Sequence, residues 1–365
     1  MTPRRRWSIV AASAVLLAVA PLAPRALPAS ESGVDAGTLL GRVQDSADEG
    51  WSGYVETAGT LQLPEADRFD DVGALVGEPA RMRAWWADRD RWRVDRLLVA
   101  GEVDLVHADG RTTTFDYERA RATVGTDPDI RLPRSADLVP PELARRLLAG
   151  VDAADVTRIG ARRVAGTSAA GLRVEPASEL SSVDHVDLWA EPRTGVALRV
   201  EVHDTARGGP AFTTGFADFS GGPPDEAEVS FRPTPGVEVR TEDVLDIADA
   251  ANQYAPLRPP AEVAGLARSG ASDGAVGVYG EGLTRLIAIP LRDSEADALR
   301  EQLVVTPGAV RTPTHTAAAL GPLSVHLTGG EGDGGWLLAG TVTPAGLQQA
   351  ADDLVAGTVY VGEDR

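Results

Sequence analysis

The sequence of 365 residues contains no cysteine. Structural disulfides, thiolate nucleophiles, cysteine-ligated zinc and iron–sulfur clusters are therefore excluded. So is the cysteine through which a bacterial lipoprotein carries its lipid anchor. Lysine is also absent, and all 35 basic residues are arginine. This second absence excludes the phosphate-binding lysine of P-loop proteins, Schiff-base chemistry and a catalytic lysine base.

Positive charge is scarce, because 54 acidic residues oppose the 35 arginines and the net charge is −19. Four of those arginines lie in the first 29 residues, which contain no acid, so the remainder carries a net charge of −23. Nucleic acids and anionic membranes attract cationic surfaces, so we predict no nucleic-acid partner. The hydrophobic content of 43% is ordinary for globular proteins, and the length suffices for two domains.

The N-terminus has the pattern of a targeting segment. Residues 1–6 are cationic, residues 7–20 form an apolar run, and Pro21 ends that run. A membrane span needs about 20 apolar residues, so this run of 14 is short for one. We predict an exported, extracytoplasmic protein in which residues 1–29 are a signal peptide cleaved after Ala29, or an N-terminal anchor if uncleaved.

Alternation of apolar and polar residues predicts a β-rich N-terminal domain over residues 30–235. Its strands are expected at 81–87, 91–98, 102–107, 112–117, 163–166, 171–175, 183–190, 196–203, 211–219 and 228–232. Asp109-Gly110 is a hairpin-turn sequence, and residues 191–195 are expected to join another hairpin. Helices are expected at 36–47 and 140–149, the second beginning with two prolines and followed by Gly150.

A helix and linker are predicted over residues 236–274, with the helix at 241–250 and a Pro/Gly/Ser-rich stretch at 255–274. Residues 275–365 are predicted to form a small α/β domain. Its strands are expected at 276–279, 283–289, 323–328 and 336–342, and its helices at 294–303, capped by Ser294, and 343–357.

No motif indicates an enzyme or a cofactor. Residues 270–274 match the G-x-S-x-G pattern of hydrolases without its strand-turn-helix context, and residues 330–335 match G-x-G-x-x-G inside a hairpin. The five histidines show no metal-ligand spacing, and we expect separate strand or loop residues and no metal site. Paired acids such as Asp70-Asp71 and Asp127/Asp129 are expected to be solvated loop residues.

The segment 81–98 is the most informative, because three tryptophans alternate there with arginines. Such a mixture can bind single-stranded nucleic acid, but the acidic chain disfavours that reading. A period of two instead places Met82, Ala84, Trp86, Trp92 and Val94 on one sheet face. A wide apolar face is either ordinary core or the wall of a lipid-sized cavity. Val103 and Val202 are expected to extend this face, and the candidate ligand-binding residues are Trp86, Trp92, Val94, Leu105, Phe115, Leu198 and Val200.

Four segments, RMRAWWADRDRWRVDRL, EVDLVHADGRTTTFDY, ADLVPPELARRLLAG and VDLWAEPRTGVALRVEV, resemble in this order the LolA-like exported proteins. These include lipoprotein and lipid carriers and the RseB/MucB regulators of envelope stress. The resemblance covers about residues 35–235 and implies an α+β fold, an unclosed antiparallel half-barrel with helices on its concave face, which binds acyl chains. The additional C-terminal domain resembles the two-domain RseB/MucB arrangement, in which the partner is a membrane-spanning anti-sigma factor.

The resemblance favours a non-enzymatic exported protein that binds a lipid, a lipoprotein acyl chain or a membrane partner such as an anti-sigma factor. A lipid or lipoprotein carrier without a regulatory role is an alternative. A second alternative is an exported hydrolase that uses an unrecognised carboxylate pair. Association with the membrane is expected through the leader or the partner.

Overall fold

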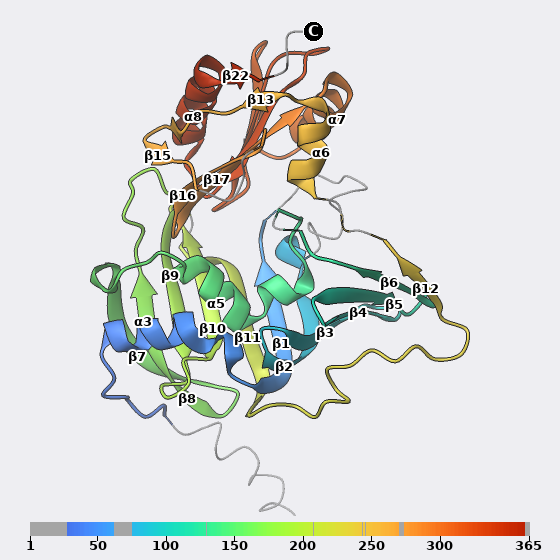
Figure 1. Cartoon of the computed structure of the whole chain (residues 1–365). Helices are drawn as coiled ribbons and strands as arrows, with labels where there is room; N and C mark the ends of the chain where they lie inside the picture. The colour runs from blue at the N-terminus through green and yellow to red at the C-terminus, as the bar shows by residue number, and fades with distance from the viewer. Residues whose placement is uncertain are drawn as a thin grey trace, which may run out of the picture.

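The computed structural model describes residues 28–61, 75–128, 130–206, 208–242, 244, 246–269 and 274–361. Residues 1–27 of the predicted leader lie outside this range, as do Asp70-Asp71, Asp129 and residues 270–273 of the G-x-S-x-G pattern. The described chain forms two sheet-based units, a large lower one and a small upper one in Figure 1. None of the helices in these described ranges is long and apolar enough to cross a membrane.

The N-terminal unit is built on a sheet of twelve strands in the order β12-β6-β5-β4-β3-β2-β1-β11-β10-β9-β8-β7. The strands are β1 (Trp51–Gly59), β2 (Ala80–Asp88), β3 (Arg91–Leu97), β4 (Glu102–Ala108), β5 (Arg111–Asp116), β6 (Arg121–Gly125), β7 (Val156–Val164), β8 (Thr167–Val174), β9 (Val183–Ala190), β10 (Ala197–Asp204), β11 (Pro210–Gly221) and β12 (Glu238–Thr241). Neighbours are antiparallel except β12, which runs parallel to β6. The two edge strands do not pair with each other in the described chain, so the expected half-barrel is unclosed.

Local sequence explains the tight turns of this sheet. Asp109 and Gly110 have φ values of +53° and +70°, so the expected two-residue turn joins β4 to β5. Between β9 and β10 the Glu191 carboxylate accepts hydrogen bonds from the backbone of Arg193 and Thr194. Gly195 has a φ of +76°, and a Cβ there would lie 2.3 Å from the backbone of Arg42. Glycine at this turn therefore allows the hairpin to pack against the first helix.

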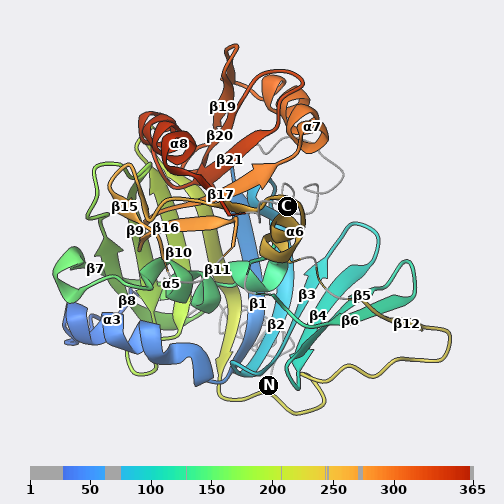
Figure 2. The same ribbon diagram turned by 45° about the horizontal axis from the view of Figure 1, so that its top comes forward.

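Helices α3 (Ala36–Asp45) and α5 (Pro140–Leu148) lie across one face of the sheet (Figures 1 and 2). The Asp35 side chain caps α3 by accepting from the Thr38 amide at 2.9 Å, and prolines occupy the first turn of α5. α5 belongs to the connection that carries the chain from β6 to the opposite sheet edge at β7. We call the helix-covered side of the sheet its inner face and the other side its outer face.

Strand register assigns side chains to these two faces. Ala84, Val94 and Leu105 are directly paired across β2, β3 and β4, and all three are buried on the inner face. Phe115 pairs instead with Asp104, so it lies on the outer face, and its expected inner position is wrong. The cause is the length of the β4–β5 turn. A turn with an odd number of residues would place residues 105 and 115 on the same face, whereas the two-residue turn Asp109-Gly110 pairs Leu105 with Thr114.

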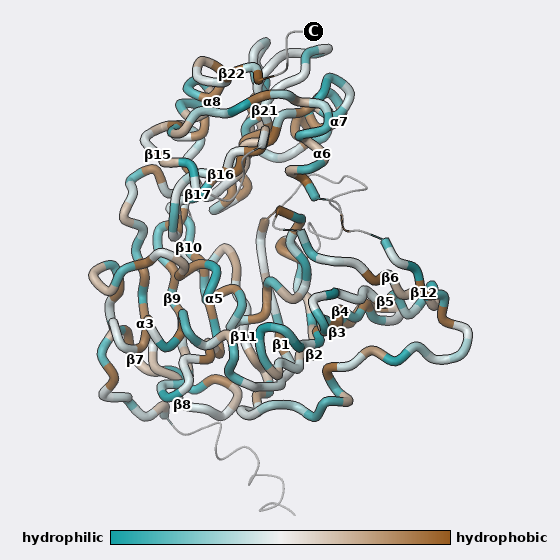
Figure 3. Tube along the Cα trace, in the orientation of Figure 1, coloured by the Kyte–Doolittle hydropathy of each residue, from teal (hydrophilic) through white to brown (hydrophobic). Residues whose placement is uncertain are grey.

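The C-terminal unit contains a six-stranded sheet in the order β16-β17-β21-β20-β19-β18. The strands are β16 (Gly277–Glu281), β17 (Thr284–Leu291), β18 (Val310–Arg311), β19 (His315–Ala319), β20 (Ser324–Thr328) and β21 (Gly335–Gly340). Leu286, Ala288 and Leu338 pack with helix α8 (Pro344–Gly357), while Ile287 and Ile289 pack with helix α6 (Ile247–Tyr254). Helix α7 (Asp293–Val304) packs against the β19–β20 end. Hydrophobic and hydrophilic positions are interspersed along both units in Figure 3.

The two units are joined at the start of β9. The Ser182 hydroxyl donates to the Pro322 carbonyl at 2.6 Å, and its amide donates to the Thr341 carbonyl at 3.2 Å. Ser181 forms an isolated β-bridge with Val342. Leu283 is buried within the core of the N-terminal unit. β9 is therefore anchored to the C-terminal sheet at the point where it enters the large sheet.

Several boundaries differ from the expectation. Residues 228–232 form no strand, and β6 and β12 were not anticipated. α6 begins at Ile247 rather than 241, because Asp246 caps it and residues up to 241 extend β12. α7 begins at Asp293 with Arg292 as its N-cap, so Ser294 is not the cap. The expected linker contains the short strands β13 (Leu257–Arg258), which pairs with β22 (Val359–Tyr360), and β14 (Glu262–Val263) with β15 (Leu266–Ala267).

Candidate functional site

A pocket of about 320 Å³ opens on the inner face, between strands β2–β4 and helix α5. Ligand sites in proteins start at roughly this size. The lining combines aromatic rings from the strands with charged side chains from α5 and from the loop that precedes it. The lining residues are Ala47, Trp86, Arg89, Trp92, His107, Asp127, Arg131, Ala136, Asp137, Glu142, Arg145 and Arg146.

The floor of the pocket belongs to a ladder of stacked rings. Trp86 stacks on Trp51 at 5.7 Å and on Trp92 at 5.4 Å, and Trp92 stacks on His107 at 5.3 Å, with all planes within 9° of parallel. The Trp86 indole donates to the Ala47 carbonyl at 3.0 Å, which fixes its ring. Trp51, Trp86, Trp92 and His107 are direct cross-strand partners on adjacent strands, which places their rings in one row. The floor is therefore an apolar stack of rings that hold one another in place.

Arginines form the opposite wall. The Arg145 guanidinium lies 5.5 Å from the Trp86 ring and pairs with Glu142. Asp137 accepts from Arg131 at 2.7 Å and from Arg146 at 2.8 Å. Burial alone would raise the pKa of Asp137, but the Arg131 hydrogen bond and the Arg146 charge outweigh it and lower that pKa below its ordinary value. The wall is thus a network of charges fixed at neutral pH.

A hydrogen-bonded chain orients His107 at the edge of the pocket. The Thr112 hydroxyl donates to Asp127 at 2.8 Å, and Asp127 also accepts from Arg134 at 2.7 Å. Since the Thr112 proton is engaged, the hydroxyl accepts from His107 Nδ1 at 2.9 Å. Burial lowers the pKa of His107, so the ring is neutral at pH 7. Asp127, expected to be a solvated loop residue, is instead paired within the site.

This arrangement suits a ligand with an apolar part and an acidic part. The tryptophan rings contribute apolar surface, and guanidinium groups pair with carboxylates or phosphates through two parallel hydrogen bonds. The four lining arginines exceed the three lining acids by one. At about 320 Å³ the pocket has the size of a headgroup or a few side chains, and a lipid-sized cavity on this face stays a prediction.

The predicted ligand-binding residues divide into three groups. Trp86 and Trp92 line the pocket. Val94, Leu105, Leu198 and Val200 lie on the inner face in the packed core and do not line the pocket. Phe115, on the outer face, contacts Tyr117 and Phe231. The structure therefore brings only the two tryptophans to an open site, and acyl-chain contact by the other inner-face residues stays a prediction.

Sequence reasoning missed the arginine wall. Arg131, Arg145 and Arg146 come from a segment far from the tryptophans in sequence, and nothing in local pattern placed that segment over the β2–β4 strands. One signal was available. In the α5 sequence PPELARRLL, Ala144 and Leu148 are four residues apart and form the buried face of the helix. Arg145 and Arg146 directly follow Ala144 and therefore lie beside that face.

The outer face carries a second charged cluster. Asp95, Glu102 and Asp104 lie together, with Arg83 pairing with Asp95 and Glu102, and Arg93 pairing with Asp95 and Asp104. Burial and the neighbouring Asp95 carboxylate raise the pKa of Asp104 to about 7. Both guanidinium groups also lie within 5.8 Å of the Trp85 ring. This arrangement is an ion-pair network. It also brings carboxylates close together, as the exported-hydrolase alternative requires.

The histidines are not separate, contrary to the expectation. His185 stacks on His203 across β9 and β10 at 4.2 Å, and His315 stacks on His326 across β19 and β20 at 4.8 Å. The first pair also lies beside Asp187. Neither pair has helical spacing, so the criterion that excluded metal ligands did not apply to them.

Comparison with known proteins finds similarity in structure only. No protein-family model matches the chain, and no curated protein matches its sequence. A LolA superfamily protein from Nitrosomonas europaea covers 55% of this chain at 10% identity with a TM-score of 0.23, too low to carry an argument. The unclosed sheet with helices on its inner face is a LolA-like α+β fold, and this chain adds a second, smaller domain to it.

That two-domain architecture is the one seen in MucB. The structure of MucB in complex with MucA(peri) covers 90% of this chain and 100% of its own, at 17% identity and a TM-score of 0.50. The complex of Pseudomonas aeruginosa MucA and MucB gives 18% identity, the same coverage and a TM-score of 0.51. At this identity the similarity establishes the fold, and it extends across both domains.

Proposed function

We propose that this protein is an exported, non-enzymatic binding protein that holds a segment of a membrane-protein partner, as a regulator of the anti-sigma-factor type. The observation that carries the proposal is the match of both domains to MucB solved with MucA. The leader-like N-terminal sequence supports export. The apolar floor and arginine wall of the inner-face pocket supply a binding surface without a reactive group.

A second candidate function, lipid or lipoprotein transport, is favoured by the pocket itself. An acyl chain transferred from water gains about 0.8 kcal/mol per buried methylene, so contact with the Trp86 and Trp92 rings would contribute without specific polar bonds. The arginines would then pair with an acidic headgroup. In the regulator, lipid in the same pocket would signal to the partner; in the carrier, lipid is the cargo.

One experiment tests whether the pocket holds lipid, as both functions require. Organic extracts of the protein purified without detergent are examined by mass spectrometry, for the wild type, Trp92→Ala and the matched control Trp85→Ala. Trp85 lies in the same hairpin on the outer face, paired with Arg93 of β3. We expect co-purified lipid in the wild type and the control and its loss in Trp92→Ala. Equal lipid content in all three proteins contradicts a role for the pocket.

The regulatory role is tested with the extracytoplasmic segment of a membrane-spanning anti-sigma factor from the same organism. Size-exclusion chromatography with light scattering should show a defined complex, and the extracted lipid should reduce its formation. A carrier instead releases lipid to acceptor vesicles and forms no such complex. Turnover of ester or glycosidic substrates that is lost in Asp104→Asn would overturn both functions in favour of the hydrolase.

A further inference from the structure

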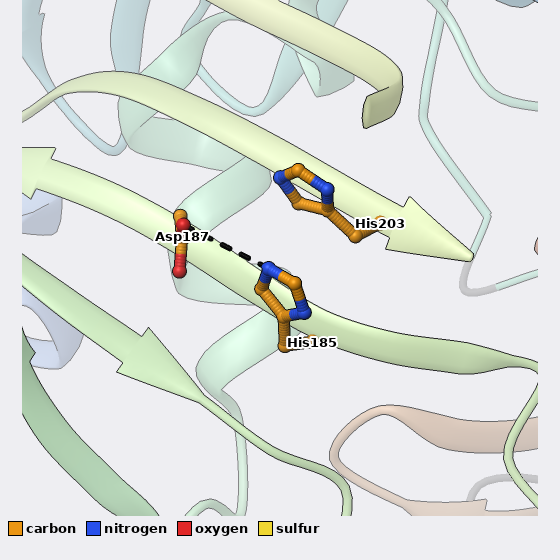
Figure 4. A group of neighbouring side chains, drawn as sticks. All are labelled: His185, Asp187 and His203. Carbon is orange, nitrogen blue, oxygen red and sulfur yellow. Dashed lines mark ion pairs between the residues drawn. The ribbon is translucent and has the colours of Figure 1, made fainter. Parts of the chain in front are cut away.

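The stacked histidine pair on the outer face lies in a setting that the proposed binding function does not use. His185 comes from β9 and His203 from β10, and Asp187 lies two residues along β9 on the same face. Figure 4 shows the two rings and the carboxylate turned toward one another. Their nearest ligand atoms all lie within 4.8 Å of one another, and His185 Nε2 is 3.8 Å from Asp187 Oδ2.

Both Nε2 atoms lack a hydrogen-bond partner although they are buried. A buried polar atom without a partner is costly, so native proteins rarely leave one without a reason. Here two such atoms occur together, beside a carboxylate. We propose that His185 Nε2, His203 Nε2 and the Asp187 carboxylate form a binding site for a divalent transition metal of the Zn²⁺ class.

The surroundings prepare His185 and Asp187 for a metal. The Asp184 carboxylate lies 2.6 Å from His185 Nδ1, so that nitrogen carries the proton and Nε2 presents its lone pair. Arg173 holds Asp187 through two bonds of 2.7 Å, and the carboxylate retains lone pairs for a metal.

The ligand atoms are spaced nearly as in a bound site. Zinc–nitrogen bonds of about 2.0–2.1 Å place tetrahedral ligand atoms roughly 3.3 Å apart, and here they lie within 4.8 Å of one another. Because the two imidazoles are stacked within 14° of parallel, at least one ring must rotate to direct its Nε2 lone pair at a shared ion. The Glu201 carboxylate lies 3.9 Å from His203 Nε2 and is within reach as a fourth ligand. The two histidine side chains are 14% and 16% exposed, which leaves the site accessible to an ion from solvent.

The other histidine pair provides an internal control. His315 and His326 stack in the same way across β19 and β20, but no carboxylate joins them in a group of possible metal ligands within the described ranges. His315 Nδ1 instead lies 3.1 Å from the Thr312 hydroxyl. Two imidazole ligands without a carboxylate make a weaker site, so the two pairs should differ in zinc affinity.

The proposed metal site lies next to the contacts that join the two units. β9 begins directly after Ser182, which is anchored to the C-terminal sheet, and β10 ends at Asp204, close to Gly321 of that unit. A metal held by His185 and His203 would cross-link these two strands within three residues of the junction. Zinc binding should therefore reduce the motion of β9 and β10 where these strands contact the C-terminal unit.

The test uses the full chain without a polyhistidine tag, freed of metal with EDTA and titrated with ZnCl₂ by calorimetry. We expect one zinc ion per chain at low micromolar affinity or tighter. The double variant His185→Gln/His203→Gln should weaken binding more than about 100-fold, and Asp184→Asn roughly 10-fold, as loss of an orienting carboxylate does. His315→Gln should bind as the wild type does. Circular dichroism of each variant confirms folding.

A measurement on the wild type alone guards against variants that do not fold. Co²⁺ bound by nitrogen and oxygen ligands in a tetrahedral site gives intense visible absorption, whereas hexaaqua Co²⁺ does not. We expect this spectrum on titration with CoCl₂ and its displacement by one equivalent of zinc. Octahedral-type absorption only, or zinc binding that survives in the His185→Gln/His203→Gln variant, would overturn the site.

Discussion

The two faces of the large sheet are made from the same strands but bury different kinds of side chain. On the inner face the side chains of β2, β3 and β4 are apolar and pack beneath α5, and Ala84 and Val94 have no exposed surface. On the outer face the alternate residues are charged, and acids such as Asp95 are buried beneath arginines rather than beneath a helix. A strand period of two produces both faces at once.

The two faces therefore stabilise the folded state through different interactions. Inner-face residues contribute through burial of apolar area and through close packing. Outer-face acids depend on nearby guanidinium groups, since a buried carboxylate without a partner is strongly unfavourable. Substitutions on the inner face should therefore lower stability at every pH, whereas those on the outer face should act through charge and vary with pH.

The largest difference between the faces should appear at adjacent tryptophans. Trp86→Ala removes a buried ring, its two stacking contacts and its bond to Ala47, and should lower the free energy of unfolding by about 3–5 kcal/mol. Trp85→Ala on the outer face should cost about 1 kcal/mol, mainly through contacts with Arg83 and Arg93. Urea denaturation measures both, and equal costs would remove the distinction between the faces.

A pH-dependent effect of intermediate size is expected at Asp104. Burial and Asp95 raise its pKa in the folded protein to about 7, above the ordinary value of 3.8. The folded state therefore holds a proton that the unfolded state releases, so stability falls as pH rises from about 4 to about 7. Asp104→Asn should flatten the stability profile across this window by more than about 1 kcal/mol. Unfolding midpoints measured at half-unit pH steps test the slope, and a wild-type slope in the variant contradicts it.

The smallest effect should come from an exposed pair on the same outer face. Arg81 lies 3.9 Å from Glu56, and their side chains are 69% and 57% exposed. Solvent screens such pairs, so Arg81→Ala should change the free energy of unfolding by less than about 0.5 kcal/mol. A loss as large as that of Trp86→Ala would show that outer-face charges stabilise the sheet without burial.

Prediction from sequence succeeded where local pattern is sufficient. The alternation at 81–87 and 91–98 placed Met82, Ala84 and Trp86 on one face, because adjacent strands joined by a short turn share a register that their own residues define. The proline-led helix at 140 and the Asp109-Gly110 turn followed from backbone chemistry. Prediction was wrong for Phe115, because the face of a side chain depends on turn parity as well as on its own strand.

By itself the sequence determined the fold class, the absence of cysteine and lysine chemistry, and the apolar row that includes Trp86 and Trp92. Only the tertiary structure decided what lies opposite that row, since Arg131 and Arg145 belong to the long connection that leads to the far sheet edge.

The tertiary structure also decided that the two histidines of β9 and β10 lie side by side. Counting back from the Ala190–Ala197 pairing would align His185 with Val202, and the bulge between Ala197 and Arg199 shifts the register by one so that His185 meets His203. One extra residue thus places two imidazoles on the same face, an outcome that depends on how the strands pair and not on what either strand contains.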